Sequence, residues 1–432
     1  MNDPPRQRQR ILSHDQPPPE KERQRSHQHL SGKRIHRRPR ESGMSTVYFG
    51  SLETNEPKSE ASLPAKLDVI LEKLGLKDAV KNQTVAIKIH LGYNNGYTTV
   101  HPFFVRRVVK AVRDAQGRPF VTDVHEAIPT AAARGYTPEV LGCPILPVAG
   151  FGDKHFYPHS LRYKSIETFH VAGALADASV LVDLSHVKGH NSCGFGAAFK
   201  NLAIGAVTAK TRADIHNTMQ HDPYWEEARC SLKEKHVETC PFDAIAWRKG
   251  RLRILFDQCN QCVRCVEAAT DRCIQINPAN FESFQEACAI STREVLSHFE
   301  KDRIFFINLA LNITPYCDCW GFTTPNVIPD IGILASRDIV ATDQATLDFA
   351  AKRGLIEENV PRWLEVRPEK HLHPFQRIMG PLKDPYLVLK HAERLGLGTR
   401  RYKIEEVMPP EKRRLPPPAK IKPPGLEPPK NP

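Results

Sequence analysis

Residues 84–122 read TVAIKIHLGYNNGYTTVHPFFVRRVVKAVRDAQGRPFVT, and this stretch decides the fold class. It opens with a β-branched run from Thr84 to His90, which is typical of a strand. The apolar side chains that follow share one helical face: Phe103, Phe104, Val108, Val109 and Val112. Gly117 ends that helix, and a second strand-like run extends from Pro119 to Thr122. The stretch therefore predicts a βαβ unit.

Strand and helix patterns keep alternating along the chain. The sequence predicts a second unit, with a helix at Ala172–Ala176, a strand at Ser179–Leu184 and a helix at Ala197–Ala203. It also predicts a third unit, with strands at Ile304–Leu309 and Ile331–Ala335 and a helix at Thr342–Lys352. Repeated alternation of this kind predicts an α/β fold, with a mainly parallel sheet covered by helices on both faces.

The chain has 432 residues, which is more than one ordinary domain, and a formal net charge of +12. That charge is concentrated at the ends, because residues 1–43 carry 11 basic and 5 acidic side chains and residues 409–432 carry 6 and 2. The body between the ends is left with +2. A nucleic-acid-binding domain shows a clustered basic face, so the body is not expected to bind nucleic acid.

Both ends of the chain are expected to be disordered. Residues 1–43 are rich in Arg, Gln, His and Pro and cannot form an apolar core, and 10 of residues 409–432 are Pro. Met44 opens directly into a strand-like run, so it is a candidate start of the protein, with a disordered extension as the alternative. There is no run of 18 apolar residues and no apolar signal segment, so we expect a cytoplasmic protein without a membrane partner.

The eleven cysteines indicate metal or redox chemistry, because thiols stay reduced in the cytosol. Cys259, Cys262 and Cys265 have C-x2-C-x2-C spacing, and Cys240 lies upstream, followed by a proline. Bacterial ferredoxins bind a 4Fe-4S cluster with three closely spaced cysteines and a remote, Pro-flanked fourth. We therefore assign these four cysteines to one 4Fe-4S cluster. The expected domains are a ferredoxin-like α+β insert at 226–290 between two parts of the α/β body, at 44–225 and 291–408.

A second cluster is not expected. A complete first motif would need cysteines at four positions, where the chain has Cys230, Lys233, His236 and Cys240. Cys273 also follows its motif later than in ferredoxins, so ordinary buried thiols are one interpretation of Cys230 and Cys273. The alternative to a cluster at the four assigned cysteines is a zinc ribbon without a redox role. The residues from Trp247 to Phe256 around Gly250 predict a small hairpin inside the insert.

The segment from Ser185 to Gly196 follows a buried strand and precedes the helix that carries Lys200. In open α/β sheets, ligands bind beyond the carboxyl ends of the strands. The segment contains His186, Lys188 and His190, so together with Lys200 it is a candidate catalytic pocket. A tight surface loop with solvated side chains is the alternative interpretation.

Two other strand ends carry candidate residues. Lys88 and His90 alternate along their strand, so both point to one face. A lysine in an apolar strand needs a counter-ion or a shifted pKa, unless it reaches solvent at the strand edge. Cys317 and Cys319 follow another strand and share a face if they are extended, where they could bind a metal or approach the cluster. Asp343, at the start of the last predicted helix, is expected to cap it.

The chain resembles the domain-of-unknown-function family 362 (DUF362) in several separated motifs that occur in the same order. These are Lys88-Ile89-His90, His186 to His190, Gly194 to Asn201, Cys317-Asp318-Cys319, and Pro329 to Ile333 with Asp338 to Gln344. The resemblance covers about residues 45–400. Members of the family commonly carry a ferredoxin-type insert. The resemblance therefore implies an iron–sulfur cofactor and this architecture, without implying a substrate.

These observations predict a cytoplasmic iron–sulfur oxidoreductase whose cluster exchanges single electrons with a pocket formed by Lys88, His90, His186, Lys188, His190 and Lys200. The lysines would hold a small acidic substrate and a histidine would transfer protons. A redox partner is implied, and no flavin or nicotinamide motif occurs. The alternatives are an electron-transfer or binding module that serves a partner protein and a non-redox enzyme with a structural cluster. If the strand ends lie together, one cavity facing the insert should be lined by His90, His190, Lys200 and Cys317.

Overall fold

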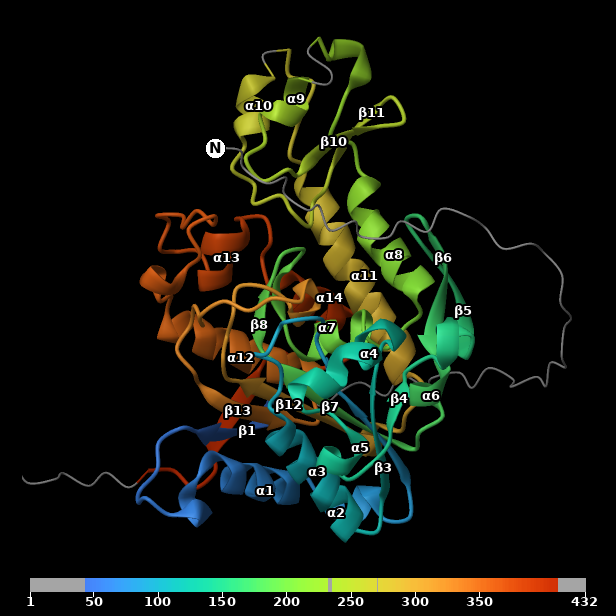
Figure 1. Cartoon of the computed structure of the whole chain (residues 1–432), viewed down its shortest axis with the longest axis vertical. Helices are drawn as coiled ribbons and strands as arrows, with labels where there is room; N and C mark the ends of the chain where they lie inside the picture. Colours follow the sequence, from blue (N-terminus) through green and yellow to red (C-terminus); the bar gives the residue numbers. More distant parts are fainter. Residues whose placement is uncertain (1–42, 232–234, 270, 411–432) are drawn as a thin grey trace, which may run out of the picture. The chain divides into compact units, whose positions relative to one another are not determined.

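The computed structural model (Figure 1) describes residues 43–231, 235–269 and 271–410. The two ends that were expected to be disordered, 1–43 and 409–432, lie almost entirely outside the described residues. Met44 lies immediately before the first described strand.

An eight-stranded sheet runs through the α/β body. In spatial order its strands are β14 (Tyr402–Glu406), β1 (Ser45–Ser51), β13 (Gly332–Ser336), β12 (Ile304–Ala310), β7 (Val180–His186), β2 (Thr84–Lys88), β3 (Arg118–Asp123) and β4 (Ile145–Pro147). All neighbours from β12 to β4 are parallel, as are β1 and β14, whereas β13 is antiparallel to both β1 and β12. The prediction of a mainly parallel sheet is confirmed. The reversed direction of β13 was not predicted.

The central strands are buried on both faces, which explains their continuous apolar sequences. Every residue of β7 and β12 is buried. These two strands pair in parallel, with Ile304 opposite Leu181 and Leu309 opposite His186. Because β7 precedes the cysteine segment in sequence and β12 follows it, both parts of the α/β body contribute to one sheet.

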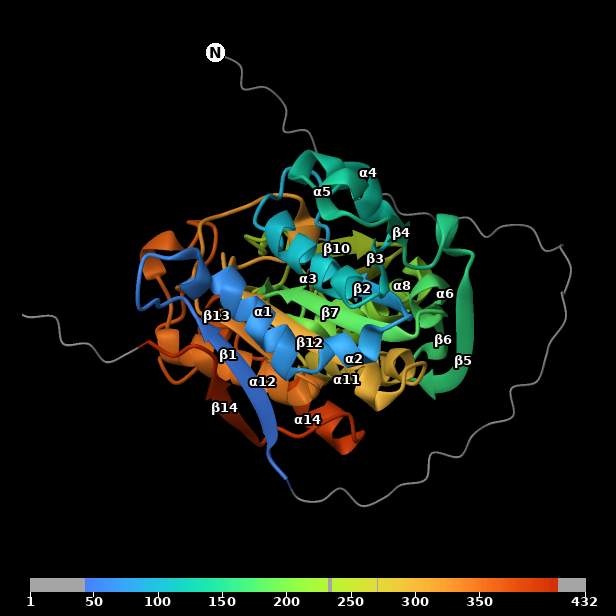
Figure 2. The ribbon, with the colours of Figure 1, turned by 90° about the horizontal axis from the view of Figure 1, so that it is seen from below.

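Helices cover both faces of this sheet, as predicted (Figures 1 and 2). One face carries α1 (Leu63–Lys73), α2 (Leu76–Val80) and α3 (Pro102–Asp114), and the other carries α7 (Ala198–Ala203), α11 (Pro278–Leu296), α12 (Ile339–Arg353) and α14 (Leu387–Arg394). Adjacent residues of β1 contact opposite layers. A Cβ added to Gly50 would lie 3.3 Å from Ile70 in α1, whereas the rings of Phe49 and Phe349 in α12 are 4.7 Å apart.

Helix α3 of the first βαβ unit differs from the prediction at one residue. Its buried face consists of Val105, Val108, Val109 and Val112. Phe103, which was predicted to share that face, is 47% exposed. It lies two positions before Val105, which is about 200° around the helix axis, so its side chain faces away from the sheet.

The cysteine segment forms a small lobe, which we call the cysteine lobe (residues 226–277). It contains α9 (Lys235–Glu238), α10 (Arg264–Ala268) and a hairpin of β10 (Ile245–Arg248) and β11 (Arg251–Ile254). Lys249 and Gly250 connect the strands with φ values of 51° and 72°, as two-residue hairpin turns require. The predicted hairpin around Gly250 is therefore present. Helix α11 runs through residue 290 and packs on α7 and α14, so the expected end of the insert falls inside a helix of the α/β body.

Further helices and strands lie in the described residues. They are α4 (Ile128–Ala131), α5 (Pro138–Leu141), α6 (Gly173–Ala176), α8 (Ala209–Asn217), α13 (Pro374–Met379), and the two-stranded pairs β5 (Phe156–Tyr163) with β6 (Ile166–Ala172) and β8 (Lys188–His190) with β9 (Gly194–Gly196). None of the described helices combines the length and the apolar character that a membrane crossing needs.

Candidate functional site

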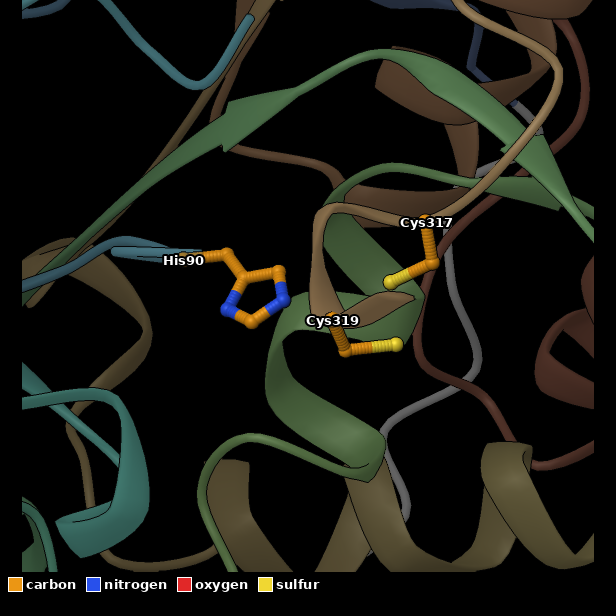
Figure 3. A group of neighbouring side chains, drawn as sticks. All are labelled: His90, Cys317 and Cys319. Carbon is orange, nitrogen blue, oxygen red and sulfur yellow. The ribbon is translucent and has the colours of Figure 1, made fainter. Parts of the chain in front are cut away.

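Three strand ends meet at one edge of the sheet. Because β2, β7 and β12 are adjacent and parallel, the segments that follow them begin at the same edge. The segment after β12 contains a short 3-10 turn at Asp318–Trp320, so Cys317 and Cys319 do not share an extended strand as expected. The turn nevertheless brings the ligand atoms of both cysteines and of His90 within 4.8 Å of one another (Figure 3).

Lys88 is fully buried beneath this edge. Its Nζ donates hydrogen bonds to Asp123 Oδ1 at 2.9 Å, Asn201 Oδ1 at 2.8 Å and Ile89 O at 2.7 Å. Burial lowers the pKa of Lys88, and the Asp123 carboxylate opposes that shift. The counter-ion expected for a lysine in this strand is therefore Asp123. Because its Nζ is already paired with the Asp123 carboxylate, Lys88 positions Asp123 and does not hold a substrate as expected.

Asp123 is a site residue that sequence reasoning missed. Its Oδ2 accepts hydrogen bonds from His90 Nδ1 at 3.0 Å and from the Leu91 N–H at 2.8 Å. This contact leaves the other ring nitrogen of His90 for the thiol of Cys317, which lies within hydrogen-bonding reach. Burial opposes protonation of His90, but Asp123 raises its pKa to about 9. The available signal was position, because Asp123 ends β3, the strand next to β2.

His186 and Lys188 form a second buried cluster around Asp318. His186 Nδ1 donates to Asp318 Oδ2 at 2.9 Å, and Lys188 Nζ lies 3.3 Å from the same oxygen. Lys188 also donates to His186 O at 3.0 Å. These contacts hold the turn between Cys317 and Cys319 against the end of β7. Lys188, like Lys88, is therefore engaged by a carboxylate and does not hold a substrate as expected.

His190 also contacts the thiol of Cys317. Its Nδ1 accepts a hydrogen bond from the Ser192 N–H at 3.1 Å, and its ring lies within hydrogen-bonding reach of Cys317. Burial, together with the nearby charge of Lys200, lowers the pKa of His190 to about 4. Lys200 also lies near Cys319. The residues His90, His190, Lys200, Cys317 and Cys319 therefore converge at this edge.

Four cysteines line a small cavity in the cysteine lobe. Its walls include Cys240, Cys259, Cys262 and Cys265, with apolar side chains from Ile245, Ile254, Val263 and Ile276. Cys240 comes from the segment before the hairpin and the other three from the segment after it. Four thiols around one apolar cavity can hold a metal centre.

A second group in the lobe was not predicted. Cys230, His236 and Cys273 are all buried, with ligand atoms within 4.8 Å of one another, and Cys273 Sγ lies 3.5 Å from His236 Nε2. His236 occupies a position where a complete ferredoxin motif would have a cysteine, which was the signal available in the sequence. Lys233, the other substituted position, lies outside the described residues. The group could bind a metal ion.

A cavity of about 580 Å³, here called the interlobe cavity, lies between the cysteine lobe and the sheet edge. Its lining includes Asn191, Tyr316 and Trp320 from the sheet edge, Pro241, Phe242 and Cys259 from the lobe, and Trp363 and Lys383 from the C-terminal part. Pro241, Phe242 and Cys259 also line the four-cysteine cavity. The cavity is therefore bordered by neighbours of the predicted pocket residues, rather than by His90, His190, Lys200 and Cys317 themselves.

Lys383 is the cation of the interlobe cavity, and sequence reasoning missed it. Its side chain is buried, its Nζ donates to Cys259 O, and burial lowers its pKa to about 8. Asp257 links the cavity to the sheet edge, because its backbone O accepts from Asn191 Nδ2 at 2.8 Å and its carboxylate accepts from Ser192 Oγ at 2.5 Å. Neither residue belongs to a recognisable motif.

The expected role of Asp343 was wrong. The N-cap of α12 is Asp338, whose Oδ1 accepts hydrogen bonds from the Val340 and Ala341 N–H groups. Asp343 is buried inside α12 and reaches another element. It accepts hydrogen bonds from the backbone N–H groups of Ala198 at 3.2 Å and Phe199 at 3.0 Å, at the start of α7. Asp343 therefore anchors the helix that carries Lys200.

The sequence pattern of a family described as Domain of unknown function (DUF362) matches residues 85–348. No curated protein matches the chain. Among solved structures, the lactate racemase apoprotein from Thermoanaerobacterium thermosaccharolyticum is similar with a TM-score of 0.37 and 9% identity, over 72% of this chain and 58% of that chain. A protein from Thermotoga maritima is similar with a TM-score of 0.31 and 12% identity, over 60% of this chain and 52% of that chain. At these TM-scores neither likeness informs the function.

Proposed function

This chain belongs to the DUF362 family, and we propose that it is a 4Fe-4S iron–sulfur oxidoreductase that exchanges single electrons with a small acidic molecule bound in the interlobe cavity. The observation that carries the proposal is the position of Cys259, which lines both the four-cysteine cavity and the interlobe cavity. A molecule in the interlobe cavity would therefore lie next to a cluster ligand.

The residues of the four-cysteine cavity fit a 4Fe-4S cluster. Three thiols come from one closely spaced run and the fourth from a remote segment followed by Pro241, which is the ligand pattern of bacterial ferredoxins. When bound, such a cluster supplies one-electron transfer. The Ala244 N–H points to Cys240 Sγ at 3.3 Å, a donor of the kind that stabilises charge on a cluster sulfur.

The lining of the interlobe cavity favours a planar molecule with an anionic group. Tyr316, Trp320 and Phe322 form an aromatic wall on which a planar group can stack, and their ring centroids lie 5.4–6.4 Å apart. Lys383 is buried, but it lines the cavity and, unlike Lys88 and Lys188, has no ion pair to a carboxylate among the described residues, so it offers the counter-charge for an acidic group. We therefore assign to Lys383 the substrate-holding role that the sequence suggested for other lysines. None of the described lining residues is a histidine, so the proton-transferring group is not assigned.

Anaerobic purification tests the cluster. The protein should contain about four iron and four sulfide per chain and show the spin-resonance signal of a reduced 4Fe-4S centre. Cys262→Ala should lose both iron and sulfide, because a thiolate ligand is removed. Cys143→Ala, which replaces a buried cysteine of the α/β body, is the matched control and should keep them. Stoichiometric zinc at these cysteines without iron, or eight iron per chain, would contradict the proposal.

A binding experiment separates an oxidoreductase from an electron-transfer module. Trp320 and Trp363 line the interlobe cavity, so their fluorescence should report a bound guest. Titration with a panel of small aromatic carboxylates should give a saturable change that Lys383→Met weakens at least tenfold. If no member of the panel gives a saturable change, the cavity is not a substrate site and the electron-transfer module becomes the better interpretation.

A further inference from the structure

A further group of potential metal ligands lies outside the cysteine lobe. His90 follows β2, and Cys317 and Cys319 flank the turn after β12, yet their ligand atoms lie within 4.8 Å of one another. Figure 3 shows the imidazole of His90 approaching the two cysteines from a different segment of the chain. One imidazole nitrogen and two thiols are ligands that a thiophilic divalent ion prefers.

The hydrogen-bond partners of His90 are those expected of a metal-binding histidine. A metal-binding histidine usually gives its other ring nitrogen to a carboxylate, which fixes the ring. Here Asp123 bonds His90 Nδ1 at 3.0 Å, and Asp123 is itself held by Lys88 Nζ at 2.9 Å and by the Leu91 N–H at 2.8 Å. All the atoms of this support are contributed by β2, β3 and the residues just beyond them, so the ring is held by the sheet.

The two cysteines are held just as firmly, but they differ in exposure. Cys317 is buried, and its thiol lies within hydrogen-bonding reach of His190. Asp318, between the two cysteines, is fixed by His186 and Lys188. Cys319 is exposed, so the group is open to small molecules on its side.

Sequence neighbours of the group line one wall of the interlobe cavity. Tyr316 and Trp320, which are adjacent in sequence to Cys317 and Cys319, line that cavity, and so does Asn191, which follows His190. Trp320 Nε1 donates a hydrogen bond to Asn191 Oδ1 at 3.2 Å, which connects the two wall segments.

We propose that His90, Cys317 and Cys319 bind a single zinc ion, or a divalent ion of similar ligand preference, with a fourth coordination position open on the Cys319 side. Three protein ligands and an open position are the arrangement of catalytic rather than structural zinc sites. Such an ion would act as a Lewis acid on an oxygen atom of a guest. The proposed zinc site uses none of the four cluster cysteines. Only the identity of the small molecule that the ion would act on rests on the proposed function.

Metal analysis of three variants tests the site. Wild-type protein, Cys319→Ser and His90→Ala are dialysed against zinc and washed, and zinc and iron are counted per chain. Both variants should hold about one zinc atom per chain less than wild type, with iron unchanged. Cys319 is exposed, so its replacement leaves the core intact. Cys193→Ala, a buried cysteine in the neighbouring β8–β9 loop, is the matched control and should keep the wild-type zinc content.

Two features keep the outcome interpretable. Any zinc bound by Cys230, His236 and Cys273 is common to all these proteins and cancels in the difference. Zinc-edge X-ray absorption of the wild-type protein should also show zinc–sulfur contacts near about 2.3 Å and zinc–nitrogen contacts near about 2.0–2.1 Å. Equal zinc content in wild type and Cys319→Ser, or a Cys317–Cys319 disulfide in place of zinc, would overturn the proposal. Loss of iron from Cys319→Ser with unchanged zinc would overturn this proposal and would also contradict the assignment of the cluster to the four lobe cysteines.

Discussion

Replacing Gly189 with alanine should push apart two segments that position the sheet-edge site. The Gly189 N–H donates a hydrogen bond to Thr314 O at 2.8 Å. A Cβ added to Gly189 would lie 2.2 Å from Pro315 O and 2.9 Å from Pro315 C. Both contacts involve backbone atoms, so no side-chain rotation can relieve them. Cys317 lies two residues beyond Pro315, so any shift of that loop moves a proposed zinc ligand.

The cost follows from the size of this overlap. The added Cβ would lie 2.2 Å from Pro315 O, whereas an ordinary contact begins at 3.4 Å. The backbones of Gly189 and Pro315 must therefore move apart by about 1.2 Å. Overpacking of this kind costs about 1–3 kcal/mol, and loss of the hydrogen bond adds about 0.5–1.5 kcal/mol, so we expect about 2–4 kcal/mol. With an unfolding entropy of about 2.1 cal/mol/K per residue over roughly 370 residues, the melting temperature should fall by about 3–5 °C.

Thermal unfolding and zinc content provide the assay, and Gly196→Ala provides the control. Gly196 lies in β9, opposite β8, but a Cβ added there would meet Lys188 Cε at 3.5 Å, an ordinary contact. Gly196→Ala should therefore melt within about 1 °C of wild type and keep its zinc. If Gly189→Ala matches Gly196→Ala in both measurements, the close approach at Pro315 does not position the site.

Three further predictions concern stability. His373 caps α13, and burial lowers its pKa to about 4. Between pH 6.5 and pH 4 the imidazole is therefore protonated in the unfolded chain but neutral in the folded chain, which lowers the free energy of unfolding as the pH falls. Relative to His373→Asn, the free energy of unfolding of wild type should fall by up to about 3 kcal/mol between pH 6.5 and pH 4. If urea unfolding gives the same pH dependence of this free energy for both proteins, the reasoning is refuted. Asp343→Ala should cost about 2–4 kcal/mol in urea unfolding, because the N–H groups that begin α7 lose their acceptor; an unchanged midpoint would contradict the assignment. Phe103→Ser should change stability by less than about 0.5 kcal/mol, whereas Val108→Ala should cost about 2 kcal/mol, and the reverse order would mean that α3 presents its other face to the sheet.

Local periodicity was enough to predict most of the layers. The apolar run of β2 and the valine stripe of α3 are properties of consecutive residues, and a fully buried parallel strand must be apolar throughout. Phe103 was misplaced because it lies at the start of α3, where the apolar spacing is irregular. The direction of β13 depends on the path of the chain between β12 and β13, which the strand sequences do not record.

The convergence of the site residues was predicted for the same local reason. Lys88, His90, His190 and Cys317 lie at or just beyond the ends of strands, and a parallel sheet brings the carboxyl ends of its strands to one edge. Their roles were not predictable, because roles depend on burial. Lys88 was a candidate for holding substrate, but its ammonium group is paired with Asp123.

The amino-acid sequence by itself determined the α/β alternation, the hairpin around Gly250 and the spacing of the cysteines from 259 to 265, because each is set by residues close together along the chain. Only the tertiary structure decided that Asp343 reaches the start of α7 and that Lys383 faces Cys259. These partners are separated by 145 and 124 residues, and their pairing depends on how the layers pack. Single polar residues at such distances leave no periodic signal, so their partners emerge only when the chain is folded.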